Sequence, residues 1–186
     1  MNHILKATAA AILGLTAFGF ASASLAATEP IHEGSLEAHV ALVESVQRNG
    51  VQVAVNHKDC SKGSFMGFYS GHRRLLVICQ DNGVPGGPMV QWTANDLDTL
   101  RHEAQHFLQD CAIGSNHDNG LVPIYISPTE LAQSTLGAEA VRRITTAYRE
   151  KGATDLVLLL EYEAFAVAEM NIPLDQVSDI TKICGA

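Results

Sequence analysis

The chain has 186 residues, a formal net charge of −8 and 47% hydrophobic residues. This length allows one domain with a substantial hydrophobic core. The acidic balance argues against nucleic-acid binding, which needs a basic footprint, and against an anionic membrane surface as a partner.

The N-terminal segment is typical of a secretory signal peptide. Lys6 ends a short basic start, residues 7–20 form an apolar run, and small residues follow up to Ala26. The run is shorter than a comfortable membrane span, although an uncleaved anchor is the alternative. We therefore predict a signal peptide at residues 1–26, one domain at residues 27–186, no stable membrane insertion after cleavage, and a periplasmic or extracellular location.

Hydrophobic periodicity and turn residues divide the remainder into short strands followed mainly by helices. Strands are predicted at residues 52–55, 64–70 and 73–80, with a further short one at 89–92 and an extended segment at 121–127. Helices are predicted at residues 36–48, 94–110, 129–133, 136–151, 154–170 and 174–181. The pattern predicts an α+β fold in which a small antiparallel or mixed sheet packs on a helical core.

All four cysteines lie after the predicted signal peptide, and an even number in an exported chain favours disulfides. Three pairings are possible. We expect Cys60 to pair with Cys79 across a local hairpin, and Cys111 to pair with Cys184, joining a helix end to the C-terminal tail. A zinc site made of cysteines is disfavoured because no C-x-x-C spacing is present.

The predicted helix at 94–110 contains the sequence His102-Glu103-Ala104-Gln105-His106. Residues four apart share one side of a helix, so both imidazoles can bind one tetrahedral zinc ion at about 2.0–2.1 Å. Glu103 would then lie over the open position, where a carboxylate can take a proton from water and pass it to a leaving amine. This spacing is the signature of zinc metallopeptidases. The alternative is a surface helix with two solvated histidines.

A catalytic zinc ion usually has three protein ligands. Gln109 and Ala112 stand where metzincins have glycine and a third histidine, which excludes that layout. The remaining candidates are Glu161 and Glu163 in the helix at 154–170, because carboxylates among leucines and alanines are costly to bury without a compensating partner. Being two residues apart, only one of them can face the metal.

Other polar residues have weaker claims to a role. His39 and His117 could act as ligands or contact a substrate, but a core or solvated histidine is the commoner case for each. The oxyanion of a peptidase needs a donor besides the metal. The sequence does not rank its four tyrosines for that role; they are Tyr69, Tyr125, Tyr148 and Tyr162.

The motif at 102–106, taken with Glu161-Tyr162-Glu163-Ala164-Phe165-Ala166, resembles the gluzincins, and most of all their small minimal-core members. It is also similar to membrane-linked peptidases whose second motif reads E-x-E-A-D. The resemblance implies a zincin-like core, a single Zn²⁺ ion, and an exported endopeptidase acting on a peptide or protein substrate. In those families the first glutamate of E-x-E-A is the metal ligand, which corresponds to Glu161 here, with Glu163 in reserve.

One position departs from that pattern. Phe165 stands where several such families have an acidic or amide residue that orients a zinc-bound histidine, so the hydrogen bond to His102 or His106 must come from elsewhere, such as a backbone carbonyl or another acid. The departure favours an alternative function, a catalytically weak or inactive zinc-binding module that binds a protein partner. A disulfide-stapled interaction domain without a metal is a further alternative.

Overall fold

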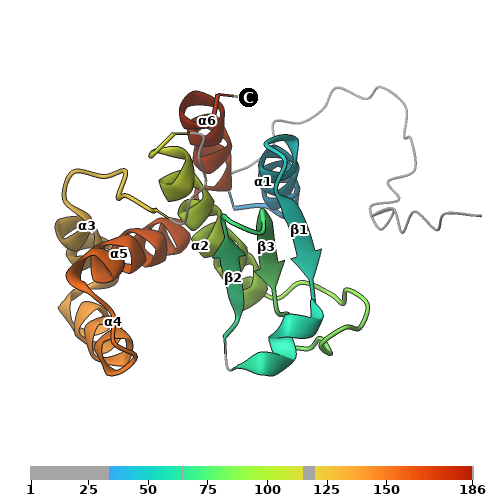
Figure 1. Ribbon diagram of the computed structural model, residues 1–186, viewed down its shortest axis with the longest axis horizontal. Coiled ribbons are helices and arrows are strands. Elements are labelled where there is room, and N and C mark those ends of the chain that lie inside the picture. The colour runs from blue at the N-terminus through green and yellow to red at the C-terminus, as the bar shows by residue number, and fades with distance from the viewer. Residues whose placement is uncertain (1–33, 64, 115–119, 186) are drawn as a thin grey trace, which may run out of the picture. The chain divides into compact units, whose positions relative to one another are not determined.

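Helices outnumber strands in the computed structural model of the chain, which describes residues 34–63, 65–114 and 120–185 (Figure 1). Within these residues there are six α-helices, one short 3-10 helix and a three-stranded sheet. The fold is α+β with a small mixed sheet, as the sequence pattern predicts. The predicted signal peptide and His117 lie outside the described residues.

The first two elements have the predicted bounds. Helix α1 spans Leu36–Arg48, and the Oγ atom of Ser35 caps it by accepting a hydrogen bond from the backbone N–H of Ala38 at 3.1 Å. Gly50, at φ +76°, lets the chain reverse after the helix. Strand β1 (Gln52–Val55) follows directly. Both predictions are confirmed because their signals, a cap and a short β-branched run, act locally.

Strands β2 (Gly67–Ser70) and β3 (Leu75–Ile78) form the predicted hairpin, although both are shorter than expected. The strand order is β1-β3-β2, with β3 parallel to β1 and antiparallel to β2. All four residues of the central strand β3 are buried, which explains its continuous apolar run. Strand β2 is therefore an edge strand of this sheet.

The prediction of a strand at residues 89–92 is wrong, because this segment is a loop. The Gln80 side chain occupies the place of a neighbouring strand: its Oε1 accepts from the Val90 N–H at 2.8 Å and its Nε2 donates to the Val90 carbonyl at 2.9 Å. The Asn56 side chain in turn donates to Gln80 Oε1 at 3.1 Å. Side-chain amides thus satisfy backbone groups that sheet pairing would otherwise satisfy.

Helix α2 spans Ala94–Cys111 and begins at a capping box formed by Thr93 and Asp96. It is the central element of the fold. It contacts α1, β2 and β3, and also two later helices, α5 (Asp155–Met170) and α6 (Pro173–Ile183). Figure 1 shows α2 running between the sheet and α5.

Two further helices, α3 (Pro128–Leu136) and α4 (Ala138–Glu150), lie against α5. Helix α3 is longer than the sequence pattern predicts. The extended segment expected at residues 121–127 contains no strand, and its backbone is bonded to the Glu163 side chain instead.

Most of the buried apolar side chains in the described residues fall into two clusters, and only the first includes residues of α2. The first joins α1, the sheet, α2 and α6, and it consists of Leu42, Val43, Val46, Val51, Val53, Leu76, Ile78, Leu100, Ala104, Phe107, Leu108 and Ile180. The second lies within α3, α4 and α5, and it consists of Ala132, Val141, Leu158, Tyr162 and Ala166. Since α2 belongs to the first cluster and α5 to the second, the two cores meet where these helices touch.

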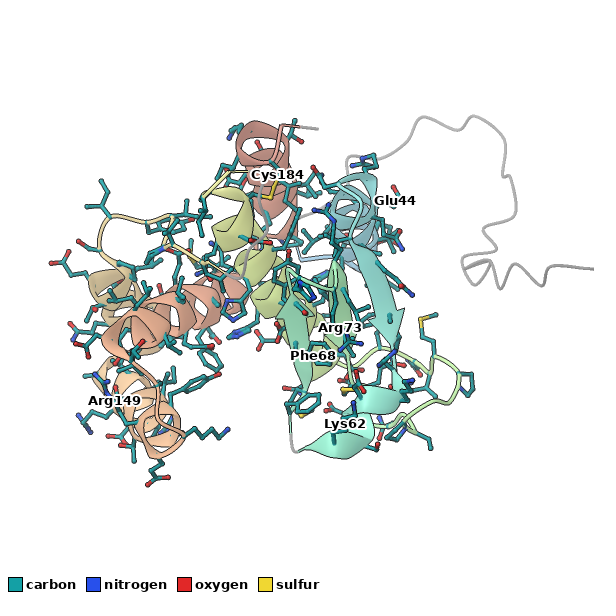
Figure 2. The ribbon with its side chains drawn as sticks, viewed as in Figure 1. Glu44, Lys62, Phe68, Arg73, Arg149 and Cys184 are labelled. Carbon is teal, nitrogen blue, oxygen red and sulfur yellow. A yellow bond between two sulfur atoms is a disulfide. The ribbon has the colours of Figure 1, made fainter. Side chains whose placement is uncertain are left out.

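Both predicted disulfides are present. Cys60, in the 3-10 helix Lys58–Lys62, pairs with Cys79 just after β3, with their Cα atoms 5.7 Å apart. Cys111 at the end of α2 pairs with Cys184, whose label in Figure 2 stands at the end of α6. These bonds are compatible with an exported protein, because disulfides persist in oxidising compartments.

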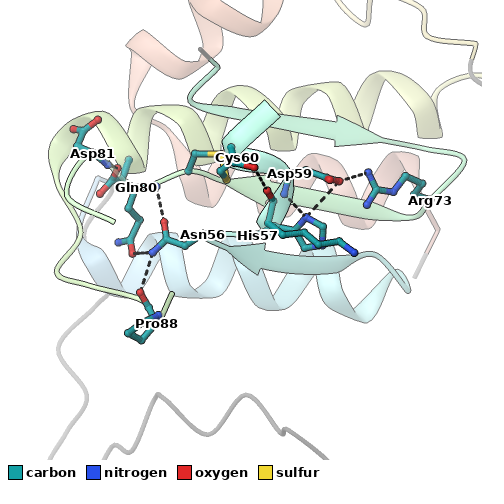
Figure 3. The surroundings of a disulfide bond; sticks show 12 residues. Asn56, His57, Asp59, Cys60, Arg73, Gln80, Asp81 and Pro88 are labelled. Carbon is teal, nitrogen blue, oxygen red and sulfur yellow. Dashed lines mark hydrogen bonds and ion pairs between the residues drawn. A yellow bond between two sulfur atoms is a disulfide. The ribbon is translucent and has the colours of Figure 1, made fainter. Parts of the chain in front are cut away.

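A charged cluster accompanies the first disulfide. Asp59 accepts a 2.9 Å hydrogen bond from Arg73 and pairs with Lys62, and His57 lies on its other side (Figure 3). Lys62 and then Arg73 lower the pKa of Asp59 to about 2. In the described part of the chain, no helix is long and apolar enough to span a bilayer.

Candidate metal centre

Helix α2 is buried around most of its circumference, yet many of its side chains are polar. One face carries Leu100, Phe107 and Leu108 into the first core. His102 and His106 are each only 8% exposed, so the alternative of a surface helix with solvated histidines is excluded. Buried polar groups require partners, and α5 supplies one that both histidines share.

Glu161 of α5 meets both histidines. Its Oε2 lies 3.3 Å from Nε2 of His102 and its Oε1 lies 3.6 Å from Nε2 of His106, while the two Nε2 atoms are 3.1 Å apart. Ligand atoms at the corners of a tetrahedron around zinc, with bonds of about 2.0–2.1 Å, are separated by about 3.3 Å. The two Glu161 distances belong to different oxygens, and with one ligand atom taken from each residue the three atoms lie within 4.8 Å of one another, so these residues could hold a metal ion after a small closure.

Glu163 takes no part in the triad formed by His102, His106 and Glu161. It is fully buried, and its carboxylate accepts hydrogen bonds from Gln105 and Gln109 of α2 and from the backbone of the segment before α3. The structure thus separates the two glutamates that the sequence offered as alternatives. Glu161 faces the histidines, and Glu163 faces a different set of donors.

The electrostatics of the triad favour a cation. Burial lowers the pKa of His106, but Glu161 and Glu103 raise it by more, to about 9. Burial likewise raises the pKa of Glu161, but the two imidazoles bring it well below its usual range. Carboxylates that stabilise a proton at this point would also stabilise a divalent ion.

The two histidines differ in the hydrogen bond made by Nδ1, the ring nitrogen that does not face Glu161. Nδ1 of His106 lies 2.8 Å from Oε1 of Gln109, one turn further along α2. Nδ1 of His102 is buried and has no hydrogen-bond partner in the described part of the chain, and the Phe165 ring packs on this imidazole with centroids 4.4 Å apart. Gln109 was not predicted in this role from the sequence, although its spacing of three from His106 was a usable signal.

Glu103 lies beside the triad, 6% exposed, and burial raises its pKa. It lines two neighbouring cavities of about 260 Å³ each, which also share Gly67, His102 and Tyr148. The backbone of Tyr69 in β2 lies beside the Glu103 carboxylate and offsets part of this rise. The edge strand of the sheet therefore borders the site directly.

Gly67 allows this close approach of β2 to α2. A Cβ atom at this position would lie 2.6 Å from Cγ2 of Thr99 and 2.7 Å from the carbonyl oxygen of Val77. It would also lie 3.2 Å from Cγ of Glu103. A residue with a side chain would push the strand away from the helix.

The structure ranks the four tyrosines. The Tyr69 hydroxyl donates to Asp110 at 2.6 Å, and the Tyr162 hydroxyl is 2.5 Å from that of Thr145. Tyr148 of α4 lines both cavities close to Glu161; burial and this carboxylate raise its pKa. Tyr125 lines neither of these cavities.

His39 has a different environment. Its Nδ1 lies 2.6 Å from the Ser35 carbonyl, to which it donates, so Nε2 accepts from the Arg101 guanidinium at 2.6 Å. Arg101 also pairs with Asp98 and lies near Glu169. Burial lowers the pKa of His39, and Arg101 lowers it further. Both ring nitrogens of His39 are therefore used within the core.

One comparison with known proteins finds a match. A family model described as a domain of unknown function, DUF8637, matches residues 34–170, which include both α2 and α5. No curated protein and no solved structure matches the chain. The description of the family assigns no activity, so the chemistry has to be inferred from the residues themselves.

Proposed function

The chain belongs to the DUF8637 family, and we propose that it is an exported zinc-dependent endopeptidase of the gluzincin type. The proposal includes a zincin-like fold and removal of residues 1–26 as a signal peptide. It rests on one observation above all: two histidines and a glutamate from separate helices converge at metal-ligand spacing, with the acidic Glu103 next to them.

The arrangement is better suited to a metal than to a static hydrogen-bonded cluster. Two Nε2 atoms face each other at 3.1 Å, and only one of them can donate to the other. Oε2 of Glu161 is buried without a hydrogen bond from any described residue. A cation among the three would satisfy all of these atoms at once. Two imidazoles and one carboxylate are the donor set of His₂Glu catalytic zinc sites.

When bound, zinc would polarise a substrate carbonyl and increase the acidity of a water molecule. Glu103 would accept the proton of the attacking water and later donate it to the leaving nitrogen. Its raised pKa suits this role, because a carboxylate that holds a proton more readily is a stronger base and then a competent acid. The scissile peptide would lie in the two cavities that Glu103 lines.

Tyr148 is the tyrosine that we assign to the carbonyl oxygen. Its ring packs against Phe165 with centroids 6.2 Å apart, and its hydroxyl lies at Glu161, on the border of both cavities. A phenol kept protonated by burial can donate a hydrogen bond to the oxygen as negative charge develops. Replacement by Phe would lower kcat by about 10²-fold and leave zinc bound.

Strand β2 is the element that we assign to substrate binding. It pairs with β3 on one side and lies at the edge of the sheet beside Glu103. An extended peptide could add to this edge through backbone hydrogen bonds. The partner is therefore a peptide or protein substrate, and the acidic chain suits no nucleic acid.

The experiment that tests the proposal compares zinc content and turnover in two variants. His106→Ala removes one ligand and should lose stoichiometric zinc by elemental analysis. Glu103→Gln leaves the triad intact, so it should retain zinc but lose cleavage of casein or a peptide library. A Glu103→Gln variant that cleaves as fast as the parent would show that the assigned role is wrong.

A second candidate function has an observation of its own. Nδ1 of His102 has no partner among the described residues, and Phe165 packs on this imidazole at the position where several gluzincin families have an acidic or amide residue. A zinc-binding module without turnover, which recognises a protein partner, fits this feature. The two candidates differ in one measurement: the parent protein carries zinc in both, but only the peptidase shows cleavage that chelation abolishes.

A further inference from the structure

Glu163 is a buried acidic residue that the proposed mechanism does not use. Its side chain is fully buried on α5, where an uncompensated charge would be very costly. Four donors compensate it. Oε1 accepts from Gln105 at 2.8 Å and from Gln109 at 3.0 Å, and Oε2 accepts from the backbone N–H groups of Ile124 and Tyr125 at 2.8 and 2.9 Å.

These contacts leave Gln109 only one orientation. Its Nε2 donates to the Leu160 carbonyl and to Glu163, both at 3.0 Å, so both of its amide hydrogens are used. A flipped amide would place its oxygen against a carboxylate and a carbonyl, which is repulsive. The Gln109 oxygen must therefore face Nδ1 of His106, 2.8 Å away.

An oxygen at this position selects one tautomer of His106. It can only accept, so Nδ1 must carry the hydrogen and Nε2 must present its lone pair toward Glu161 and His102. Only that tautomer of the neutral ring can bind a metal through Nε2. A chain of fixed contacts thus runs from Glu163 through Gln109 to His106.

We infer that Glu163 is a positioning residue for the metal centre: through Gln109, it fixes the tautomer and orientation of His106. This inference rests on the proposed function, since it assumes that the triad binds a metal. Phe165 cannot accept a hydrogen bond from Nδ1 of either histidine. Gln109, held by Glu163, accepts the one from His106. Glu163 also ties the segment at residues 121–127 to α5, and Leu121 of that segment borders the site.

The test measures the zinc affinity of the full chain by competition with a chelator, and the absorption spectrum of the cobalt-substituted protein. Glu163→Gln frees Gln109 to flip, and Gln109→Met removes the acceptor while leaving the other donors to Glu163 in place. Both should weaken zinc binding about 10–100-fold, the usual effect of losing an outer hydrogen bond to a metal ligand. Gln105→Met is the matched control, since Gln105 donates to the same carboxylate but to no imidazole in the described contacts.

The double variant Gln109→Glu with Glu163→Gln, which exchanges the two side chains, gives the sharper test. The carboxylate then at position 109 would accept from His106. The amide then at position 163 would donate to that carboxylate, while its oxygen still accepts from the backbone. The carboxylate at position 109 would also lose the hydrogen bond to the Leu160 carbonyl, so recovery should be partial: this double variant should bind zinc more tightly than Glu163→Gln alone and less tightly than the parent. Circular dichroism would select folded variants; if no variant at position 163 folds, an unchanged zinc affinity of Gln109→Met would by itself overturn the inference, because the chain of contacts runs through Gln109.

Each outcome has a distinct meaning. Zinc affinities of Glu163→Gln and Gln109→Met within twofold of Gln105→Met, with an unchanged cobalt spectrum, would overturn the inference but leave the proposed function standing. A parent chain that binds neither metal would overturn the proposed function and this inference with it. Loss of affinity in the two single variants and recovery in the double variant would establish the positioning role.

Discussion

Replacing Gly67 by Ala tests whether the close approach of β2 to α2 serves the chemistry. The added Cβ would lie 2.6 Å from Cγ2 of Thr99, whereas ordinary van der Waals contact begins near 3.4 Å. The strand must therefore move by about 0.8 Å, and the backbone of Tyr69 must move with it. Because Tyr69 and Glu103 line the same cavity and the new Cβ would also press on Cγ of Glu103, the base and the substrate edge shift relative to each other, and a displacement of this size can cost about 10²-fold in kcat/KM.

The assay is cleavage of a quenched fluorescent peptide by the zinc-loaded protein, together with its zinc affinity. The three ligands lie on helices α2 and α5, so zinc affinity should change little while kcat/KM falls. Gly71→Ala is the matched control, since its Cβ would lie similarly close, 2.7 Å, to Oδ2 of Asp110 at the other end of the hairpin. A folded Gly67→Ala variant that cleaves within threefold of the parent would refute the reasoning.

Three other predictions concern stability. Removing the Cys111–Cys184 disulfide, which spans 73 residues, should lower the free energy of unfolding in urea by about 4.4 kcal/mol. Removing Cys60–Cys79, which spans 19 residues, should lower it by about 3.2 kcal/mol. Equal losses would argue against loop entropy as the cause. His39 has a lowered pKa in the folded protein, so stability should be full above about pH 6.5 and fall below it, by at most about 1.4 kcal/mol per pH unit. Chemical unfolding of His39→Gln between pH 5 and pH 7.5 should show a weaker decline than the parent, and an identical decline would exclude His39 as its source. Thr93→Ala should lower the unfolding free energy by about 1 kcal/mol through loss of the α2 cap, which thermal melts would detect and which an unchanged Tm would contradict.

Much of the fold was predictable because its signals are short-range. Ser35 and Thr154 stand directly before the apolar runs of α1 and α5, and each accepts a hydrogen bond from the first turn of its helix. The absence of a strand at residues 89–92 was not predictable in this way. The apolar residues of this segment suit a strand, but the Gln80 amide, folded back from the end of β3, takes the hydrogen bonds that pairing would need.

The candidate site likewise has features that helix geometry predicts and features that it does not. The spacing of His102 and His106 follows from helix geometry alone, so the sequence by itself determined that two imidazoles share a side of α2, with Glu103 beside them. Helical periodicity also dictated that Glu161 and Glu163 point in different directions. It could not say which one meets the histidines, because that depends on how α5 is rotated about its own axis.

Only the tertiary structure decided that rotation. Leu158, Tyr162 and Ala166 of α5 pack into the second core with α3 and α4, and this packing turns Glu161 toward α2 across the junction of the two cores. The same packing places Glu163 among side-chain amides of α2 and backbone donors of the segment at residues 121–127. A short stretch of sequence identifies the chemical groups of the site. Their convergence depends on the burial of apolar surface between segments far apart in the chain, which no short stretch determines.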